Sequence, residues 1–435
     1  TLQLVAPQRP PGPIALPTRG LIGFPPEPQR FVGRLQPMLR ASQALAPGSE
    51  RRGVLFHGMP GAGKTACALE LAYRHEQGRF AGQVWYAAPQ ADSDIAPALF
   101  TLLFEVQRQL NAPDLGLTTA LDDPQRFRDY TLPRLRALLE QNALLLVLDN
   151  LETLLTDSNQ WRIPLWGAVI ETLLAQNGPS RVLLTSRRAP AALAHDVRLQ
   201  IEPIHALSFA ESVLLAHELP QLKRLFADAP GRSLLQHTLR VVQGHPKLLE
   251  MADALAADRA ALATRVAAGE AELATHGEVL DAFFAVGGTR EGETRQPAET
   301  VIQALQGWTD GLTARLSPTG QLLFAFLCRL EPDDRRQDVL QANWADFLRR
   351  LGDSDAAAVA ALAAPENGVP TALEALRAAG LLEVSRPTFE AGQLEALAAL
   401  ESQAPAAGAP DAAALQQLRA ALAAQATSYA IHPGV

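Results

Sequence analysis

The stretch from Gly58 to Thr65, with the sequence GMPGAGKT, constrains the fold of this chain more than any other feature. It fits the pattern G-x-x-x-x-G-K-[ST], in which backbone N–H groups surround the phosphates of a nucleotide. Glycines let the main chain curl tightly without a Cβ pressed against the phosphates. The pattern predicts that Lys64 contacts the β- and γ-phosphates and that the Thr65 hydroxyl faces Mg²⁺. The alternative is that Lys64 lies in an ordinary glycine-rich surface turn. The segments on either side of the loop distinguish this interpretation from phosphate binding.

Those flanking segments favour phosphate binding. Residues 53–57 predict a short buried strand and residues 65–76 predict a helix, an order that aims amide dipoles at an anion. Lysine is also rare here: of 38 basic residues, only Lys64, Lys223 and Lys247 are lysines. A compact ammonium suits a phosphate loop better than a planar guanidinium does, so a lysine retained at this position supports the site. The residues expected to line the nucleotide are Pro60, Gly61, Ala62, Gly63, Lys64, Thr65 and Ala66.

Composition sets the broad class of the protein. With 435 residues, 48% of them hydrophobic and 19% charged, the chain is globular and has room for several domains. A net charge of −8 gives no general reason to expect nucleic-acid binding. Two cysteines, Cys67 and Cys328, cannot form a disulfide framework and favour a reducing cytoplasm. No apolar run is long enough for a membrane span and no signal peptide is recognisable, so we expect a cytoplasmic protein without a membrane partner.

The first half of the chain predicts an α/β fold. Residues 1–30 are rich in proline and predict an extended linker without a core of its own. Short apolar runs then alternate with longer helical ones, which predicts a parallel sheet with helices on both faces across residues 31–205. The expected strands are 54–57, 83–87, 144–148, 181–185 and 197–201, and the expected helices include 95–110, 125–141 and 166–176. Ligands of such sheets bind at the carboxyl ends of the strands.

The second half predicts mainly helices. Ser208 followed by Glu211 is a capping-box pattern and begins a helical domain expected over residues 206–290. Residues 291–435 predict further helices followed by two strands, near 380–384 and 428–432. That order is typical of a winged-helix domain. An alanine-rich helical insertion is expected at residues 391–426.

A second element of the nucleotide site follows the apolar run 144–148. Asp149 comes at the carboxyl end of this predicted strand, 85 residues after Lys64. Mg²⁺ prefers oxygen ligands and keeps several waters, so Thr65, Asp149 and the phosphates suffice to bind it. An aspartate that caps a turn after a core strand is the alternative interpretation.

Two further positions bear on hydrolysis. Asn150 follows Asp149, and an amide cannot accept the proton of an attacking water. Glu152 is the nearest carboxylate that could polarise that water, so we expect slow hydrolysis. Arg187, after the strand at 181–185, is the candidate sensor of the γ-phosphate, whereas Arg188 could be an ordinary surface charge. Because no lysine precedes an aspartate by two residues, the guanine-reading motif is absent and adenine is the expected base.

Together these motifs resemble the STAND class of signal-transducing ATPases, which includes the NB-ARC and NACHT proteins. The closest resemblance is to bacterial members that have tetratricopeptide-type sensors. Five elements occur in the order of that class: Phe31–Val32–Gly33–Arg34 ahead of the phosphate loop, the loop itself, Leu144 to Asp149 with Thr185–Ser186–Arg187, Gly244–His245–Pro246, and Ile431–His432–Pro433. The resemblance implies that Val32, Gly33 and Arg34 lie against the adenine, that Pro246 packs on the nucleotide, and that His432 touches the β-phosphate of ADP. Asn150, Ile431 and Pro433 depart from the pattern of the class.

The resemblance implies a molecular switch. ADP would hold a closed resting state, and exchange for ATP would drive self-oligomerisation and activate an effector in bacterial signalling or antiviral defence. An N-terminal effector and a C-terminal repeat sensor would lie outside this sequence. The implied enzyme is a slow ATPase with Lys64, Asp149, Glu152 and Arg187 as catalytic residues. Two alternatives stay open: a transcription regulator whose DNA-binding domain lies elsewhere, and a motor or loader ATPase of the AAA type that applies its winged helix to DNA.

Overall fold

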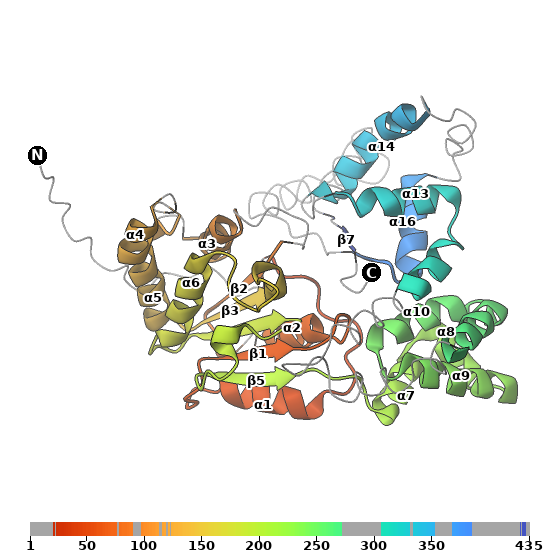
Figure 1. Cartoon of the computed structure of the whole chain (residues 1–435), viewed down its shortest axis with the longest axis horizontal. Coiled ribbons are helices and arrows are strands. Elements are labelled where there is room, and N and C mark those ends of the chain that lie inside the picture. The colour runs from red at the N-terminus through yellow and green to blue at the C-terminus, as the bar shows by residue number, and fades with distance from the viewer. Residues whose placement is uncertain are drawn as a thin grey trace, which may run out of the picture. The chain divides into compact units, whose positions relative to one another are not determined.

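The structure is a computed structural model that describes residues 21, 23–75, 78–89, 97–112, 115–118, 121, 123–271, 306–330, 334–352, 368–384, 427 and 429–431. These residues fall into two compact units (Figure 1). The first ends at Leu207 and the second begins at Ser208.

The first unit contains a five-stranded sheet in the order β2-β3-β4-β1-β5, with every neighbouring pair parallel. The strands are β1 (Gly53–His57), β2 (Gly82–Ala87), β3 (Leu144–Asp149), β4 (Arg181–Ser186) and β5 (Leu199–Pro203). This confirms the predicted parallel α/β sheet. Strands β1 and β4 are neighbours, but the connections that follow them run in opposite directions across the sheet. The connection after β1 leads to β2 at one edge, and the connection after β4 leads to β5 at the other edge. Their carboxyl ends therefore form the topological switch point at which such sheets bind ligands.

Helices cover both faces of the sheet. Leu55, Tyr86, Leu146 and Leu184 belong to one core cluster with side chains of α3 (Ala98–Gln109), α5 (Leu132–Gln141) and α6 (Pro164–Ala175). Side chains of the opposite pleat, among them Val54, Phe56, Val147 and Leu183, are also buried. On that side, α1 (Leu35–Leu45) contacts β1 and β5, while α2 (Lys64–Arg74) contacts β1, β3 and β4. Burial on both faces explains why the strands are continuous apolar runs.

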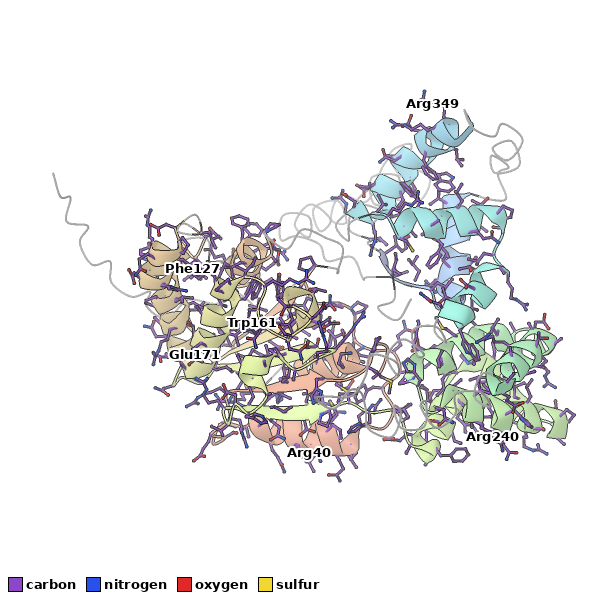
Figure 2. The ribbon with its side chains drawn as sticks, viewed as in Figure 1. Arg40, Phe127, Trp161, Glu171, Arg240 and Arg349 are labelled. Carbon is purple, nitrogen blue, oxygen red and sulfur yellow. The ribbon has the colours of Figure 1, made fainter. Side chains whose placement is uncertain are left out.

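The predicted helix at 125–141 is interrupted in the structure. It consists of α4 (Pro124–Arg126), a π-helical turn (Phe127–Thr131) and α5. Pro133 lies one residue into α5 and lacks the N–H that a regular helix would donate, which accounts for the wider turn before it. Phe127, labelled in Figure 2, is completely buried in the core cluster.

Part of the proline-rich N-terminal segment packs on the first unit. Phe24 is 6% exposed and its ring lies 5.6 Å from that of Trp85 on the edge strand β2. The Tyr73 hydroxyl donates a hydrogen bond of 2.8 Å to the Pro25 carbonyl.

The side chain of Gln109 contacts the backbone of Trp85 on the edge strand β2. It accepts from the Trp85 N–H, at 2.8 Å, and donates to the Trp85 carbonyl, at 2.7 Å. This amide therefore pairs with the outward-facing backbone of Trp85 as a neighbouring strand would.

The second unit is mostly helical within its described residues. Its helices are α7 (Phe209–Glu218), α8 (Pro220–Leu225), α9 (Ala229–Val242), α10 (Pro246–Ala256), residues 259–271, residues 306–313, α13 (Pro318–Leu327), α14 (Gln337–Gly352) and α16 (Val369–Ala378). Ser208 and Glu211 form the predicted capping box at the start of α7. Strands β6 (Leu382–Val384) and β7 (Tyr429–Ile431) pair antiparallel. The expected insertion at 391–426 lies outside the described residues.

A buried lysine joins two parts of the second unit. Lys247, in the first turn of α10, is 2% exposed and donates a hydrogen bond of 2.5 Å to the Gly380 carbonyl. Gly380 has a φ of 67° and ends α16, with N–H bonds from Gly380 to Arg377 and from Leu381 to Leu376. This is the Schellman arrangement of a helix C-terminus, where a cation is favourable. The ammonium thus links α10 to the turn that precedes β6.

Candidate nucleotide-binding site

The loop after β1 has the backbone conformation that its glycines permit. Gly58, Gly61 and Gly63 have φ values of 145°, 68° and 95°. Gly63 is the N-cap of α2, and Lys64 is the first residue of that helix. The loop therefore ends at the N-terminus of α2, a helix of 11 residues. The N–H groups of the first turn and the helix dipole favour a bound anion there.

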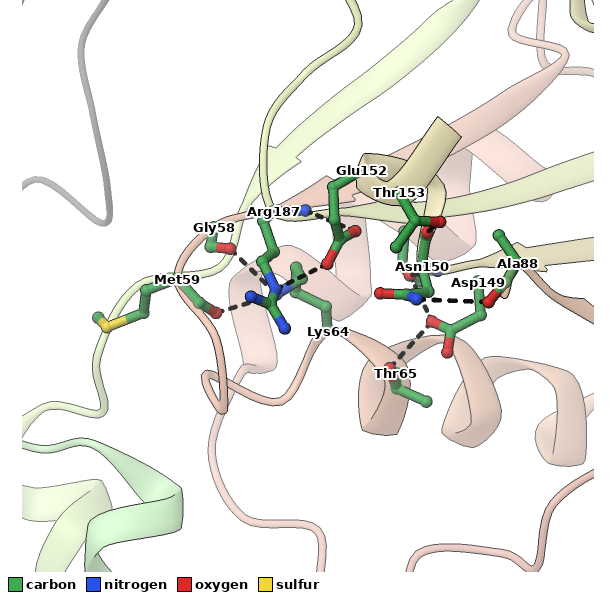
Figure 3. A network of polar contacts seen from close by, with 11 residues as sticks. Gly58, Met59, Lys64, Thr65, Ala88, Asp149, Asn150, Glu152, Thr153 and Arg187 are labelled. Atoms are coloured by element: carbon green, nitrogen blue, oxygen red, sulfur yellow. Dashed lines mark hydrogen bonds and ion pairs between the residues drawn. The ribbon is translucent and has the colours of Figure 1, made fainter. Parts of the chain in front are cut away.

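Lys64 points back into this loop (Figure 3). Its ammonium donates hydrogen bonds of 3.0 Å to the Gly58 carbonyl and 2.9 Å to the Met59 carbonyl. Lys64 is only 9% exposed, and this burial lowers the pKa of its ammonium to about 8, although the negative charge of Glu152 opposes the shift. A buried ammonium held by two neutral carbonyls is poorly neutralised, so phosphate oxygens would be better partners for it.

Thr65 and Asp149 meet at the expected magnesium position. The Thr65 hydroxyl donates a hydrogen bond of 2.9 Å to Asp149 Oδ1, and the Thr185 hydroxyl donates to the same oxygen. Asp149 is 8% exposed, and burial raises its pKa while the two hydroxyls lower it. A hydroxyl and a carboxylate together fit Mg²⁺ beside phosphates, because hard cations take oxygen ligands.

The sequence predicts Thr185 at the end of a strand and in the element Thr185–Ser186–Arg187, but it does not predict the contact of Thr185 with Asp149. Strand β4 lies between β1 and β3, and Leu148 pairs with Leu184, so the next residues of these strands, Asp149 and Thr185, lie level with each other. The available signal was a hydroxyl at the carboxyl end of the fourth strand. Its significance depends on the order of the strands, which the sequence alone does not give.

Asn150 has a conformational role that the sequence did not reveal. Its φ is 65°, a left-handed conformation that asparagine tolerates better than most residues. Its backbone N–H donates 3.1 Å to Thr185 Oγ1 and its side-chain amide donates 3.3 Å to the Ala88 carbonyl. The left-handed residue turns the chain sharply from β3 into a 3₁₀-helix (Leu151–Leu154), which carries Glu152.

The two remaining catalytic candidates contact each other. Arg187 Nε lies 2.8 Å from Glu152 Oε1, and the Arg187 backbone N–H donates 3.1 Å to Glu152 Oε2 (Figure 3). The neighbouring Arg188 donates instead to the carbonyls of Thr156, at 3.3 Å, and Asp157, at 3.2 Å. Arg188 therefore holds the loop after the 3₁₀-helix and is separate from the phosphate site.

Arg34 supports the loop from the segment ahead of α1. Gly33 and Arg34 both have left-handed backbones, with φ values of 73° and 61°. Arg34 is 8% exposed and donates 2.8 Å to the Ala62 carbonyl inside the phosphate loop and 3.4 Å to the Ala206 carbonyl. These contacts offset the cost of a non-glycine residue in this conformation, about 1–2 kcal/mol.

The other predicted site residues lie as follows. Val32 precedes this left-handed turn, Pro60 lies within the phosphate loop, and Ala66 is in the first turn of α2. Pro246 is the first residue of α10 in the second unit, where the His245 imidazole accepts 3.3 Å from the Leu248 N–H. His432 lies outside the described residues.

No protein-family model matches the chain, and no curated protein sequence matches it. Among solved structures, the chain is similar to a STAND protein with a tetratricopeptide repeat sensor from Pyrococcus horikoshii, with 15% identity and a TM-score of 0.46 over 82% of this chain and 40% of that protein. It is also similar to a Walker-type ATPase of Pyrococcus abyssi, with 13% identity and a TM-score of 0.34 over 81% of this chain and 91% of that one. The Aeropyrum pernix ORC1 protein, solved in complex with DNA, matches with 14% identity and a TM-score of 0.34 over 84% of this chain and 88% of ORC1.

The chain thus spans less than half the length of the STAND protein that it matches. Within the described residues, no helix is long and apolar enough to cross a membrane.

Proposed function

We propose that this chain is the nucleotide-dependent switch of a STAND-type ATPase, with ADP as the resting ligand and Mg²⁺ as the metal. One observation carries the proposal: the Thr65 hydroxyl lies 2.9 Å from Asp149, next to the buried ammonium of Lys64 at a helix N-terminus. These groups supply the cation, metal ligands and amide dipoles that a nucleotide phosphate requires.

Each residue has a defined task in this proposal. Lys64 and the loop N–H groups bind the phosphates, while Thr65 and Asp149 hold the metal, which would neutralise phosphate charge when bound. Arg34 fixes the loop through the Ala62 carbonyl. Thr185 orients Asp149 by the hydrogen bond that it donates to the carboxylate.

Slow hydrolysis follows from the residues after Asp149. Asn150 donates hydrogen bonds and carries no carboxylate, so it cannot act as a base. Both oxygens of Glu152 accept from Arg187, so an attacking water would have to share this carboxylate with the guanidinium. A switch with low turnover is the function that such a site serves. We further propose a closed state in which Pro246 and His432 contact ADP. ATP binding would drive oligomerisation and activate an effector, in signalling or antiviral defence.

The proposal is tested with the purified 435-residue chain. We expect ADP to be released on acid denaturation after mild purification, and Mg²⁺-dependent binding of ADP and ATP by calorimetry. Lys64→Ala should abolish binding, whereas Lys223→Ala, which removes an exposed lysine on α8, should leave it unchanged. Equal affinity of the Lys64 variant and the native chain would refute the site. Rapid, DNA-stimulated turnover would instead favour the motor ATPase.

A further inference from the structure

Glu152 is held more specifically than a surface ion pair requires. One carboxylate oxygen accepts from the Arg187 guanidinium, at 2.8 Å, and the other accepts from the Arg187 backbone N–H, at 3.1 Å. The side chain of Glu152 is 11% exposed and that of Arg187 is 42% exposed. A partly buried carboxylate with both oxygens engaged keeps a fixed position, unlike an isolated exposed pair.

The local backbone places Glu152 there. The left-handed conformation of Asn150 starts the 3₁₀-helix immediately after Asp149, so the chain does not continue away from the sheet. A hydrogen bond of 3.1 Å from the Thr153 hydroxyl to the Asn150 carbonyl stabilises this turn. Glu152 is therefore directed toward the end of β4, where Arg187 begins the next loop.

The charge of Glu152 acts on the same cations that a terminal phosphate needs. Apart from burial, the charges with most effect on the pKa of Lys64 are those of Glu152 and Arg187, ahead of Asp149. Figure 3 shows the Glu152–Arg187 pair next to Lys64. A carboxylate that is paired with a guanidinium and whose charge also acts on an ammonium resembles the anionic oxygens of a γ-phosphate in charge and in partners.

We propose that Glu152 makes the site selective for a nucleoside diphosphate over the triphosphate, by holding Arg187 in an ion pair that the γ-phosphate must displace. A diphosphate uses Lys64, the loop N–H groups and the metal ligands, and leaves this pair intact. A triphosphate brings further negative charge toward Glu152 and competes with it for Arg187, so part of its binding energy is lost. This inference rests on the proposed function and adds the determinant of ADP preference.

The test compares the affinities of ADP and of a non-hydrolysable ATP analogue, each with Mg²⁺, for the native chain and for Glu152→Gln. Glutamine keeps the shape and one acceptor oxygen but removes the charge. We expect the analogue to bind about tenfold more tightly to the variant, the effect of one charge-assisted hydrogen bond, and ADP affinity to change less than about twofold.

Arginine variants give the opposite expectation. Arg187→Gln should weaken the analogue by about tenfold and leave ADP binding unchanged, because only the triphosphate uses this guanidinium. Arg188→Gln is the matched control, since Arg188 donates to the carbonyls of Thr156 and Asp157, and it should change neither affinity.

The outcomes separate this inference from the proposed function. If the native chain binds both nucleotides and Glu152→Gln leaves their affinity ratio unchanged, ADP selection by Glu152 is wrong and the switch proposal stands. Slower hydrolysis at an unchanged ratio would mean that Glu152 polarises water, which also overturns the inference. If the native chain binds neither nucleotide, both proposals fail.

Discussion

Nucleotide affinity should fall as the pH rises, and this loss should begin at a pH well below the range in which an ordinary lysine titrates. Burial lowers the pKa of Lys64 to about 8, whereas an ordinary lysine titrates near 10.4. Phosphate binding favours the ammonium, so bound nucleotide raises this pKa again. By linkage, proton binding and nucleotide binding assist each other, and affinity is lost as pH rises through about 8.

The size of the effect follows from the fraction of protein that carries the ammonium. With a pKa of about 8, roughly nine-tenths of the nucleotide-free protein is protonated at pH 7 and about one-tenth at pH 9. The dissociation constant of Mg-ADP should therefore rise about tenfold between these values. A lysine with an ordinary pKa would change it by less than about 5%. The phosphates of ADP contribute little, because their last proton is lost near pH 6.

Calorimetry at pH 7, 8 and 9 measures this dependence. At pH 8, titrations in two buffers of different ionisation enthalpy should show an uptake of about half a proton per bound nucleotide. The exposed-lysine variant Lys223→Ala should give the same slope as the native chain. Affinities that agree within twofold from pH 7 to 9, in protein that circular dichroism shows to be folded, would refute the assignment of a buried phosphate-binding ammonium to Lys64.

Three further changes test other parts of the structure. Asp149→Asn keeps an acceptor for the hydroxyls but removes the carboxylate, so ADP affinity measured with Mg²⁺ and with chelator should become equal; a persisting Mg²⁺ effect would exclude this ligand. Arg34→Ala removes a buried hydrogen bond of 2.8 Å to the Ala62 carbonyl. It should lower the free energy of unfolding in urea by about 1.5–3 kcal/mol, and an unchanged value would contradict the role given to Arg34. Phe24→Ala removes a buried ring and should lower the free energy needed to detach the segment around Phe24 by about 3 kcal/mol. Trypsin should then cleave after the exposed Arg30 on the order of 100-fold faster. Unchanged cleavage would show that this ring does not anchor the segment.

Much of the candidate nucleotide site was predictable because its signals are local. The glycines that adopt positive φ, the lysine at the start of a helix and the aspartate at the end of an apolar strand all lie within short stretches. Strand positions were predicted to within about two residues, since burial on both faces makes each strand a continuous apolar run. The strand expected at 197–201 is observed at Leu199–Pro203, because Val197 remains 79% exposed ahead of it.

The roles of several residues could not be read from their neighbours in the chain. The sequence does not predict that the Arg34 guanidinium donates to the carbonyl of Ala62 in the phosphate loop, and the predicted position of Arg34 against the adenine stays a prediction. Glu152 was expected as a possible base, and the structure shows it held by Arg187. Nothing near Lys247 in the sequence predicts that it is buried and donates to the Gly380 carbonyl after α16, 133 residues away. Each contact joins residues far apart in sequence, which no local pattern specifies.

The sequence by itself determined the parallel α/β sheet, the glycine loop that ends at a helix N-terminus and the aspartate at the end of β3, because backbone conformation and apolar periodicity are encoded within a few residues. Only the tertiary structure decided which side chains share the carboxyl ends of β1, β3 and β4. Strand order brings Thr185 to Asp149 and Arg187 to Glu152, and strand order results from the packing of the whole unit. The burial that lowers the pKa of Lys64, and the charges of Glu152 and Arg187 that modify this pKa, come from that same packing.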